Sequence, residues 1–271
     1  MNNISRVAGL LNAESQRLPI DKKELEGVLD ILFHRILFPV CDEECKSEKS
    51  IYQVYSVLLD NLSSLLSKEE AGKIVEAFIE KLPGLQTKLY EEAKNFLKND
   101  PAAGTIEEVI LTYPGFFALT VHRISHELYK MNVPIIPRLF SEYAHATVGI
   151  DIHPGAKIGN MFFIDHGTGI VIGETTIIGD NVKIYQGVTL GALFVTKSLK
   201  NQKRHPTIED NVVIYAGATI LGGDTVIGHD STIGGNVWLT KSVIPYSLVF
   251  HTSEVKIKNA HDFDEPINFV I

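Results

Sequence analysis

The feature of this sequence that most constrains its fold is an aliphatic residue at every sixth position from residue 152 to residue 239. Glycine often follows that residue, where a turn needs a positive φ or room for a neighbouring backbone. A single short β-rung cannot bury its aliphatic side chains, whereas stacked rungs pair their backbones and align these side chains in one interior column. The repeat therefore predicts a parallel β-helix. Its interior residues are expected to be Ile152, Ile158, Ile164, Ile170, Ile172, Ile178, Ile184, Leu190, Ile208, Ile214, Ile220, Leu221, Ile227, Ile233 and Leu239.

The repeat is interrupted at three places. Its phase slips near residue 171 and again near residue 221, which predicts a bulge or a turn at each point. Between Leu190 and Ile208 the repeat disappears, so the segment 192–203 is expected to leave the column as an extruded loop. Long loops on rigid scaffolds often carry function.

Ahead of the repeat, the apolar residues follow a helical period. Leu25, Leu29 and Leu32 recur at spacings of three and four, which predicts an amphipathic helix. Asp21 and Ser67 precede such patterns and are typical N-caps. We therefore expect an α+β chain with a helical domain over 1–147, a β-helix over 148–245 and a tail over 246–271. Within the helical domain, further helices are expected over 84–98, 102–112, 115–130 and 136–146.

Composition narrows the class of protein. The chain has 271 residues, of which 45% are hydrophobic, and a formal net charge of -8. A nucleic-acid role is disfavoured because no clustered basic face is evident. No apolar signal core opens the chain and no run approaches the roughly 20 apolar residues of a membrane span, so we expect a cytoplasmic protein. Cys41 and Cys45 are interpreted as ordinary thiols, and no metal is expected.

Three histidines lie in polar neighbourhoods within the repeat: His153, His166 and His205. Asp151 precedes His166 by fifteen residues, close to one circuit of a three-sided coil, so the carboxylate and the imidazole are expected to meet. Such a pair suits a general base, because the carboxylate orients the ring and stabilises the imidazolium. The alternative is a corner histidine that bonds a backbone carbonyl.

Six runs of the sequence carry a recognisable pattern: Asp100-Pro-Ala, Gly115-Phe-Phe-Ala-Leu-Thr-Val-His-Arg123, Asp151-Ile-His-Pro-Gly-Ala-Lys-Ile-Gly159, Asp165-His-Gly-Thr-Gly-Ile-Val-Ile-Gly-Glu-Thr175, Gln186-Gly-Val-Thr-Leu-Gly191 and Arg204-His-Pro206. These runs resemble the serine O-acetyltransferases, which belong to the hexapeptide-repeat acyltransferase superfamily. The resemblance covers about residues 90–245 and implies a left-handed β-helix behind an N-terminal helical domain. It also implies transfer of acetyl from acetyl-CoA to the hydroxyl of L-serine, which is the first step of cysteine biosynthesis.

The resemblance assigns roles to the polar residues. His166 matches the general base, and Asp151 matches its orienting partner. The carboxylates of Asp100 and Asp165 match groups that receive the serine ammonium. The serine carboxylate would be held by Arg204 and His205.

The resemblance also implies where acetyl-CoA binds, in a groove between neighbouring β-helices of a homotrimer or a dimer of trimers. A backbone amide near Gly191 and Ala192 is expected to stabilise the oxyanion. Small side chains are expected along the pantetheine arm at Ala192, Ala216 and Gly235. Direct attack is expected, because neither cysteine lies in the motif region.

Further partners follow from the same resemblance. L-cysteine is expected as an inhibitor that uses the amino-acid groups of the serine site. The C-terminal Ile271 is expected to insert into O-acetylserine sulfhydrylase. The sequence departs from the usual pattern at Gly104, where an acidic residue is frequent, and in the tail, which lacks the glycine-valine-proline-alanine segment.

Two other functions are compatible with the sequence. The acceptor could be another small hydroxy compound such as homoserine, because one methylene alters discrimination by only about 1–3 kcal/mol. Alternatively, the chain could be a non-catalytic β-helix that binds and regulates the sulfhydrylase.

Overall fold

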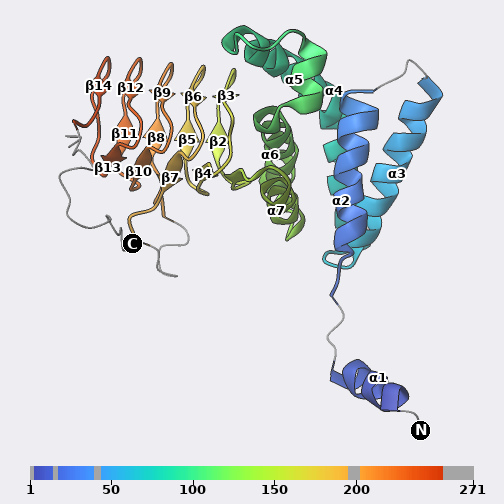
Figure 1. Cartoon of the computed structure of the whole chain (residues 1–271). Coiled ribbons are helices and arrows are strands. Elements are labelled where there is room, and N and C mark those ends of the chain that lie inside the picture. Colours follow the sequence, from blue (N-terminus) through green and yellow to red (C-terminus); the bar gives the residue numbers. More distant parts are fainter. Residues whose placement is uncertain (1–2, 15–17, 40–43, 195–201, 253–271) are drawn as a thin grey trace, which may run out of the picture.

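The structure is a computed structural model, which describes residues 3–14, 18–39, 44–194 and 202–252. A helical half is followed by a parallel β-helix, so the expected α+β organisation is confirmed (Figure 1). In the described part of the chain, no helix has the length and apolarity that a membrane span requires. The helices are α1 (Asn3–Glu14), α2 (Lys22–Ile31), the π-helix η1 (Leu32–Leu37), α3 (Glu44–Ser63), α4 (Lys68–Asn99), α5 (Ile106–Thr112), α6 (Pro114–Lys130) and α7 (Ile136–Val148).

Two expected helix boundaries were wrong. We expected a separate helix over 84–98, but α4 runs unbroken through Pro83. Pro83 lies on the exposed face of the helix, so water can bind the carbonyl that its missing N–H leaves unpaired, while the buried Leu82 and Leu85 hold both sides of the proline against the core. The helix expected over 102–112 begins later, at Ile106, because Thr105 supplies the N-cap and accepts a hydrogen bond from the Glu108 amide.

The strands stack in three parallel sheets. The first contains β1, β4, β7, β10 and β13, the second β2, β5, β8 and β11, and the third β3, β6, β9, β12 and β14. Asp151 pairs with Val171, 20 residues on, but Ile177 pairs with Thr207, 30 residues on, because the expected loop leaves the column between them. The strands are β1 (Asp151–Ile152), β2 (Lys157–Ile158), β3 (Phe163–Ile164), β4 (Val171–Ile172), β5 (Ile177–Ile178), β6 (Lys183–Ile184), β7 (Thr189–Gly191), β8 (Thr207–Ile208), β9 (Val213–Ile214), β10 (Thr219–Leu221), β11 (Val226–Ile227), β12 (Thr232–Ile233), β13 (Trp238–Leu239) and β14 (Leu248–Val249).

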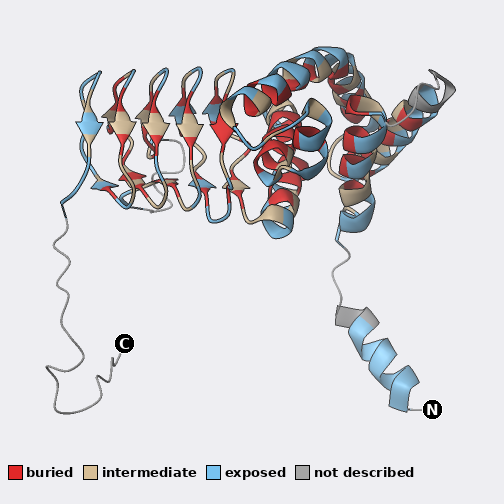
Figure 2. Cartoon of the chain, turned by 45° about the horizontal axis from the view of Figure 1, so that its top comes forward, coloured by how far each residue is buried: buried red, intermediate tan, exposed pale blue. Residues whose placement is uncertain are grey.

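The interior column contains the residues that the repeat predicts, with two exceptions. From Ile152 to Ile233 the repeated residues other than Leu221 are buried. In Figure 2, buried segments in red accordingly alternate with tan and pale blue ones along the coils. Leu221 is a correction, because it follows the buried Ile220 in the same strand and successive strand residues point to opposite faces. Leu239, in the last coils, is only half-buried.

The helical domain closes the first end of this column. Each coil donates its backbone N–H groups to the carbonyls of the next coil, as Asp151 N does to Ile170 O at 2.9 Å. The carbonyls of the first coil therefore have no earlier coil to pair with, and unpaired buried carbonyls are costly. Helix side chains donate to them instead. Ser141 Oγ donates to Ile152 O at 2.8 Å, and Asn95 Nδ2 donates to Met161 O at 2.8 Å.

Arg123 makes the most extensive of these contacts. Its guanidinium donates to Ile158 O at 2.6 Å and to Gly159 O at 2.5 Å. The same group forms a buried ion pair with Glu92, with Arg123 Nε 3.1 Å from Glu92 Oε1. Arg123 on α6 and Glu92 on α4 are 5% and 1% exposed, so the pair ties two helices to the first coil without contact with water.

Arg123→Ala is expected to lower the free energy of unfolding by about 3–5 kcal/mol, because it leaves Glu92 buried without a partner. The measurement is urea denaturation followed by circular dichroism. Lys73→Ala is the control, since Lys73 pairs with Glu69 in an exposed pair of the kind that contributes less than about 1 kcal/mol. Equal losses in the two variants would contradict the assigned role of Arg123.

Candidate active site

The corner that carries His166 has an uncommon backbone conformation. His166 has a φ of 57°, and Gly167 and Gly169 have φ values of 89° and 81°. Glycine adopts positive φ without steric cost, whereas histidine is held there by its surroundings. A Cβ on Gly167 would lie 2.5 Å from Ile150 Cδ1, so close packing also requires glycine at this position. The turn presents the imidazole to solvent, with 70% of the His166 side chain exposed.

Polar side chains surround this corner, and we call Asp100, Tyr113, Asp165 and His166 the His166 group. His166 Nδ1 lies 3.6 Å from Asp165 Oδ1. Tyr113 Oη donates to Asp100 Oδ2 at 2.6 Å. This hydrogen bond is the main reason that the pKa of Asp100 is lowered, with smaller contributions from the Ala102 amide and from His166. The same bond raises the pKa of Tyr113 to about 12. The corner thus combines an exposed imidazole with two carboxylates.

A second set of polar residues lies on the next edge of the β-helix, after β4, and we call His153, Glu174, Arg204 and His205 the Arg204 group. The Arg204 guanidinium forms an ion pair with Glu174. Tyr129 Oη also donates to Glu174 Oε1, at 3.0 Å. Burial alone would raise the pKa of Glu174, but the hydrogen bonds from Arg204 and Tyr129 lower it. Glu174 therefore fixes the guanidinium beside His205.

The hydrogen bonds of His205 define its tautomer. The Thr175 amide donates to His205 Nδ1 at 3.1 Å, so Nδ1 is an acceptor and the proton lies on Nε2. Burial, followed by the charge of Arg204, lowers the pKa of His205 to about 4. The ring packs against Gly173, where a Cβ would lie 2.0 Å from His205 Cδ2. The geometry gives a neutral imidazole that could donate a hydrogen bond from Nε2 to a ligand.

Asp151 lies on the same edge of the β-helix as the Arg204 group. It opens β1 and points away from the column, and Arg138 Nη1 lies 3.7 Å from Asp151 Oδ1. Burial lowers the pKa of His153, while the charges of Glu174 and Asp151 oppose that shift. Within the described residues, no hydrogen bond or ion pair joins Asp151 to His166. The contact expected from their spacing therefore stays a prediction.

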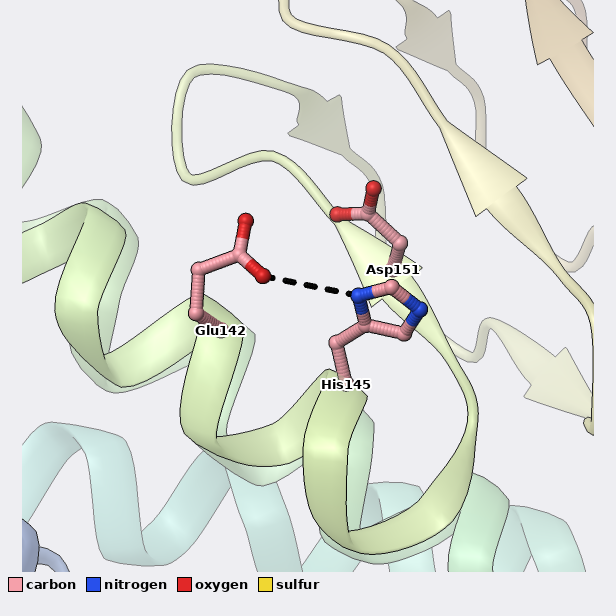
Figure 3. Close-up of side chains that lie close together, drawn as sticks. All are labelled: Glu142, His145 and Asp151. Carbon is pink, nitrogen blue, oxygen red and sulfur yellow. Dashed lines mark hydrogen bonds and ion pairs between the residues drawn. The ribbon is translucent and has the colours of Figure 1, made fainter.

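Asp151 also has neighbours that could ligate a metal. Glu142, His145 and Asp151 place one ligand atom each within 4.8 Å of one another, and Figure 3 shows the three side chains converging from α7 and β1. The sequence did not suggest this cluster. However, the Arg138 guanidinium pairs with both carboxylates and its positive charge opposes a metal cation. We assign no metal to it.

The residues expected to contact the acyl donor are divided between the same two edges. Ala216 and Gly235 lie on successive coils along the His166 edge, where a Cβ on Gly235 would be 3.2 Å from Ala216 O. Gly191 ends β7, and Ala192 follows it on the edge of the Arg204 group. The expected extruded loop, 192–203, lies partly outside the described residues. Ile271, which is expected to bind the sulfhydrylase, lies wholly outside them.

Sequence reasoning missed two polar residues of these groups, Glu174 and Tyr113, and also Thr175, which bonds His205. Glu174 and Thr175 stand in the same run as His166, so their position in the motif was a usable signal. Tyr113 gives no such signal, because its partner Asp100 is brought to it by the fold of α4 and α5.

Comparisons with known proteins identify similar chains. A scan against protein-family models returns no match. A plasmid-encoded serine acetyltransferase of Synechococcus elongatus is 52% identical over 180 residues, which are 65% of this chain and 56% of that protein. The matched segment spans about half the length of several curated relatives, including a second serine acetyltransferase of that organism, at 53% identity over 50% of its length.

Solved structures match over more of the chain. Serine acetyltransferase 1 of Entamoeba histolytica, in complex with L-cysteine, superimposes with a TM-score of 0.76 at 35% identity, covering 86% of this chain and 87% of that one. Serine acetyltransferase of Neisseria gonorrhoeae, in complex with serine, gives a TM-score of 0.60 at 26% identity, covering 89% and 97%.

Gly173→Ala is expected to displace the His205 ring, since its Cβ would overlap Cδ2 and Nε2 of that ring. Nuclear magnetic resonance of the histidine side chains should then show His205 titrating closer to the ordinary pKa, about 6.5. Gly72→Ala in α4 is the control, because a Cβ there meets nothing within 4 Å. An unchanged His205 titration in Gly173→Ala would contradict the assigned packing.

Acid is expected to destabilise the fold as pH falls from about 6.5, the pKa of an unperturbed histidine, towards 4. Burial lowers the pKa of His205 to about 4 and that of His122 well below its usual value, so over this range the unfolded chain binds more protons than the native one. Urea denaturation at a series of pH values measures the slope. His122→Leu should reduce that slope, because it removes a group that binds a proton in the unfolded chain but not in the native one. The substitution breaks no hydrogen bond, since neither ring nitrogen of His122 has a partner. An equal slope in this variant would refute the contribution of His122.

Proposed function

This chain belongs to the serine acetyltransferase family, and from that membership we propose that it transfers the acetyl group of acetyl-CoA to the hydroxyl of L-serine. The product would be O-acetyl-L-serine, the precursor for cysteine biosynthesis. The observation that carries the proposal is the pair of edges described above. One presents an exposed imidazole and two carboxylates, and the next presents a guanidinium and a neutral imidazole donor.

We propose that each active site forms between two copies of the chain. In one copy, Asp151 and the Arg204 group lie on a different edge from His166. Association of β-helices edge to edge, as in the expected homotrimer, would bring the His166 group of one copy against the Arg204 group of its neighbour. The orienting carboxylate of Asp151 would then reach the His166 of the neighbouring copy. This arrangement explains why the two residues are not bonded within one chain.

The chemistry follows from this arrangement. His166 accepts the proton of the serine hydroxyl as its oxygen bonds to the thioester carbonyl carbon. The carbon–sulfur bond then breaks, and the imidazolium returns the proton to the departing thiolate. The carboxylate of Asp151 orients the ring and stabilises its charged form, as a carboxylate does in related general-base pairs. A backbone amide at Gly191 or Ala192 would donate to the oxyanion.

The two edges also account for the choice of substrate. The serine ammonium needs carboxylates, which Asp100 and Asp165 supply on the first edge. The serine carboxylate needs fixed donors, which Arg204 and the Nε2 of His205 supply on the second. Acetyl-CoA would lie along the groove between the copies, past Ala216 and Gly235.

We also propose that L-cysteine inhibits by competing for the serine site. Cysteine carries the same ammonium and carboxylate groups as serine, so the same four side chains would hold it. The Entamoeba histolytica relative described above was solved in complex with L-cysteine. Competition between cysteine and serine in initial-rate assays would support this inhibition.

His166→Ala and Asp151→Ala are each expected to lower kcat by a factor of about 10² to 10⁴, because each removes part of the general base. Co-expression of the two variants tests the placement between copies. If His166 and Asp151 come from different chains, randomly mixed trimers should regain about one quarter of the wild-type activity per site, since a quarter of the interfaces combine both intact residues. The doubly substituted chain mixed with wild type is the control for assembly.

Three outcomes would contradict the proposal. Mixed assemblies with no recovered activity would place both residues of a pair in one chain. Release of CoA that is faster with homoserine than with serine would assign a different acceptor. A chain that releases no CoA with either acceptor but still binds the sulfhydrylase would favour the non-catalytic scaffold.

A further inference from the structure

The carboxylate of Asp151 has one oxygen that is shielded from water but not hydrogen-bonded. Within the described residues, this oxygen, Oδ1, has no hydrogen-bond partner. The side chain as a whole is 22% exposed, so its exposure lies on atoms other than Oδ1. A buried polar oxygen without a hydrogen bond costs free energy, which makes the charged group nearest to it important.

The charged group that faces this oxygen is the guanidinium of Arg138. Arg138 Nη1 lies 3.7 Å from Asp151 Oδ1, a distance that suits an ion pair but is too long for a hydrogen bond. In the described part of the chain, no other side chain forms an ion pair with Asp151. Burial is the main cause of the lowered pKa of the adjacent His153, and the charge of Arg138 contributes to it. The charge of Arg138 therefore acts on this edge of the β-helix.

Helix α7 holds the Arg138 guanidinium in place. Nη2 of Arg138 forms an ion pair with Glu142, one turn further along the helix. Ser141 of the same helix donates to Ile152 O at 2.8 Å, which anchors α7 to the strand that Asp151 opens. In Figure 3, the side chains of Glu142 and Asp151 accordingly converge from α7 and β1. One nitrogen of the guanidinium is thus tied to its own helix, and the other faces Asp151.

We propose that Arg138 is a positioning residue for acetyl transfer, which holds Oδ1 of Asp151 so that Oδ2 is directed towards His166 of the neighbouring copy. This inference rests on the proposed function and on the site between two copies. A carboxylate orients an imidazole only while its own side chain is held in one orientation. Arg138 would restrict that rotation through Oδ1, and it would act on the reaction through Asp151 without contacting either substrate.

Arg138→Gln tests this role in the full-length chain, because it removes the charge and keeps a polar side chain. Steady-state assays of CoA release should show kcat lowered by about 10- to 100-fold, since misplacement of a reacting group has effects of this size. The KM values for serine and acetyl-CoA should stay near those of the wild type, because Arg138 contacts neither substrate. Arg138→Lys should recover part of kcat, since its ammonium group can still pair with Oδ1.

Lys73→Gln is the matched control for Arg138→Gln. Lys73 also forms an ion pair with a glutamate one turn away on an exposed helix face, that of Glu69 on α4. This control should keep the wild-type kcat. Thermal unfolding followed by circular dichroism should give the wild-type midpoint for Arg138→Gln, because its side chain is 44% exposed. A wild-type kcat in Arg138→Gln would overturn the proposal.

A double variant separates positioning from a purely structural role. If Arg138 acts through Asp151, then adding Arg138→Gln to Asp151→Ala should lower kcat no further, because the group that Arg138 positions is already gone. A second loss of the same size in this background would overturn the proposal. Failure of the proposed function gives a different result, since Asp151→Ala and His166→Ala would then release CoA at the wild-type rate.

Discussion

The fold depends on how the carbonyls of the first coil are satisfied. A parallel β-helix passes its hydrogen bonds from coil to coil, so its first coil presents acceptors with no strand to pair them. Here, the helices supply donors from side chains rather than from a strand, with Arg123, Asn95 and Ser141 each reaching a different part of the coil. The free-energy cost of burying the guanidinium is offset by Glu92. Arg123 also bonds the carbonyls of Ile158 and Gly159, so the helical domain and the β-helix cannot separate without breaking these contacts.

The same β-helix geometry explains why the polar residues are divided between two edges. A three-sided coil points its outward side chains to separate faces, so residues that belong to one chemical task but to different edges cannot meet within one chain. The turn that carries His166 lies at the start of β4. Arg204, where the chain comes back from the extruded loop, lies on the edge that follows β4. A site that needs both a general base and donors that bind a substrate carboxylate is therefore more easily assembled from coils of two neighbouring molecules than from the coils of a single molecule.

Much of this could be predicted from sequence, because burial in a β-helix repeats locally. Ile158 and Ile178 occupy their column positions for reasons contained in a few residues, and the loop after Leu190 is marked by the loss of the same repeat. Pro83 was misjudged because packing on both sides of it outweighed a local rule. Leu221 was misjudged because it alternates with the buried Ile220 along the same strand. The bond between Tyr113 and Asp100 and the pair of Arg123 with Glu92 could not be predicted, since nothing local relates residues that only the folded helices bring together.

Helix α4 connects the stability of the fold to the geometry of the site. Glu92 and Asn95 lie on the turns of α4 that meet the first coil. Phe96 packs on Phe163 with ring centroids 4.9 Å apart. Asp100 is the C-cap of the same helix. Phe163 in turn lies in β3, two residues before Asp165. A shift of α4 along its axis would therefore break the cap of the coil and move one carboxylate of the His166 group relative to the other. The distance between the carboxylates of Asp100 and Asp165 is therefore set by buried aromatic and ionic contacts. These contacts fix the positions of the exposed side chains of the site.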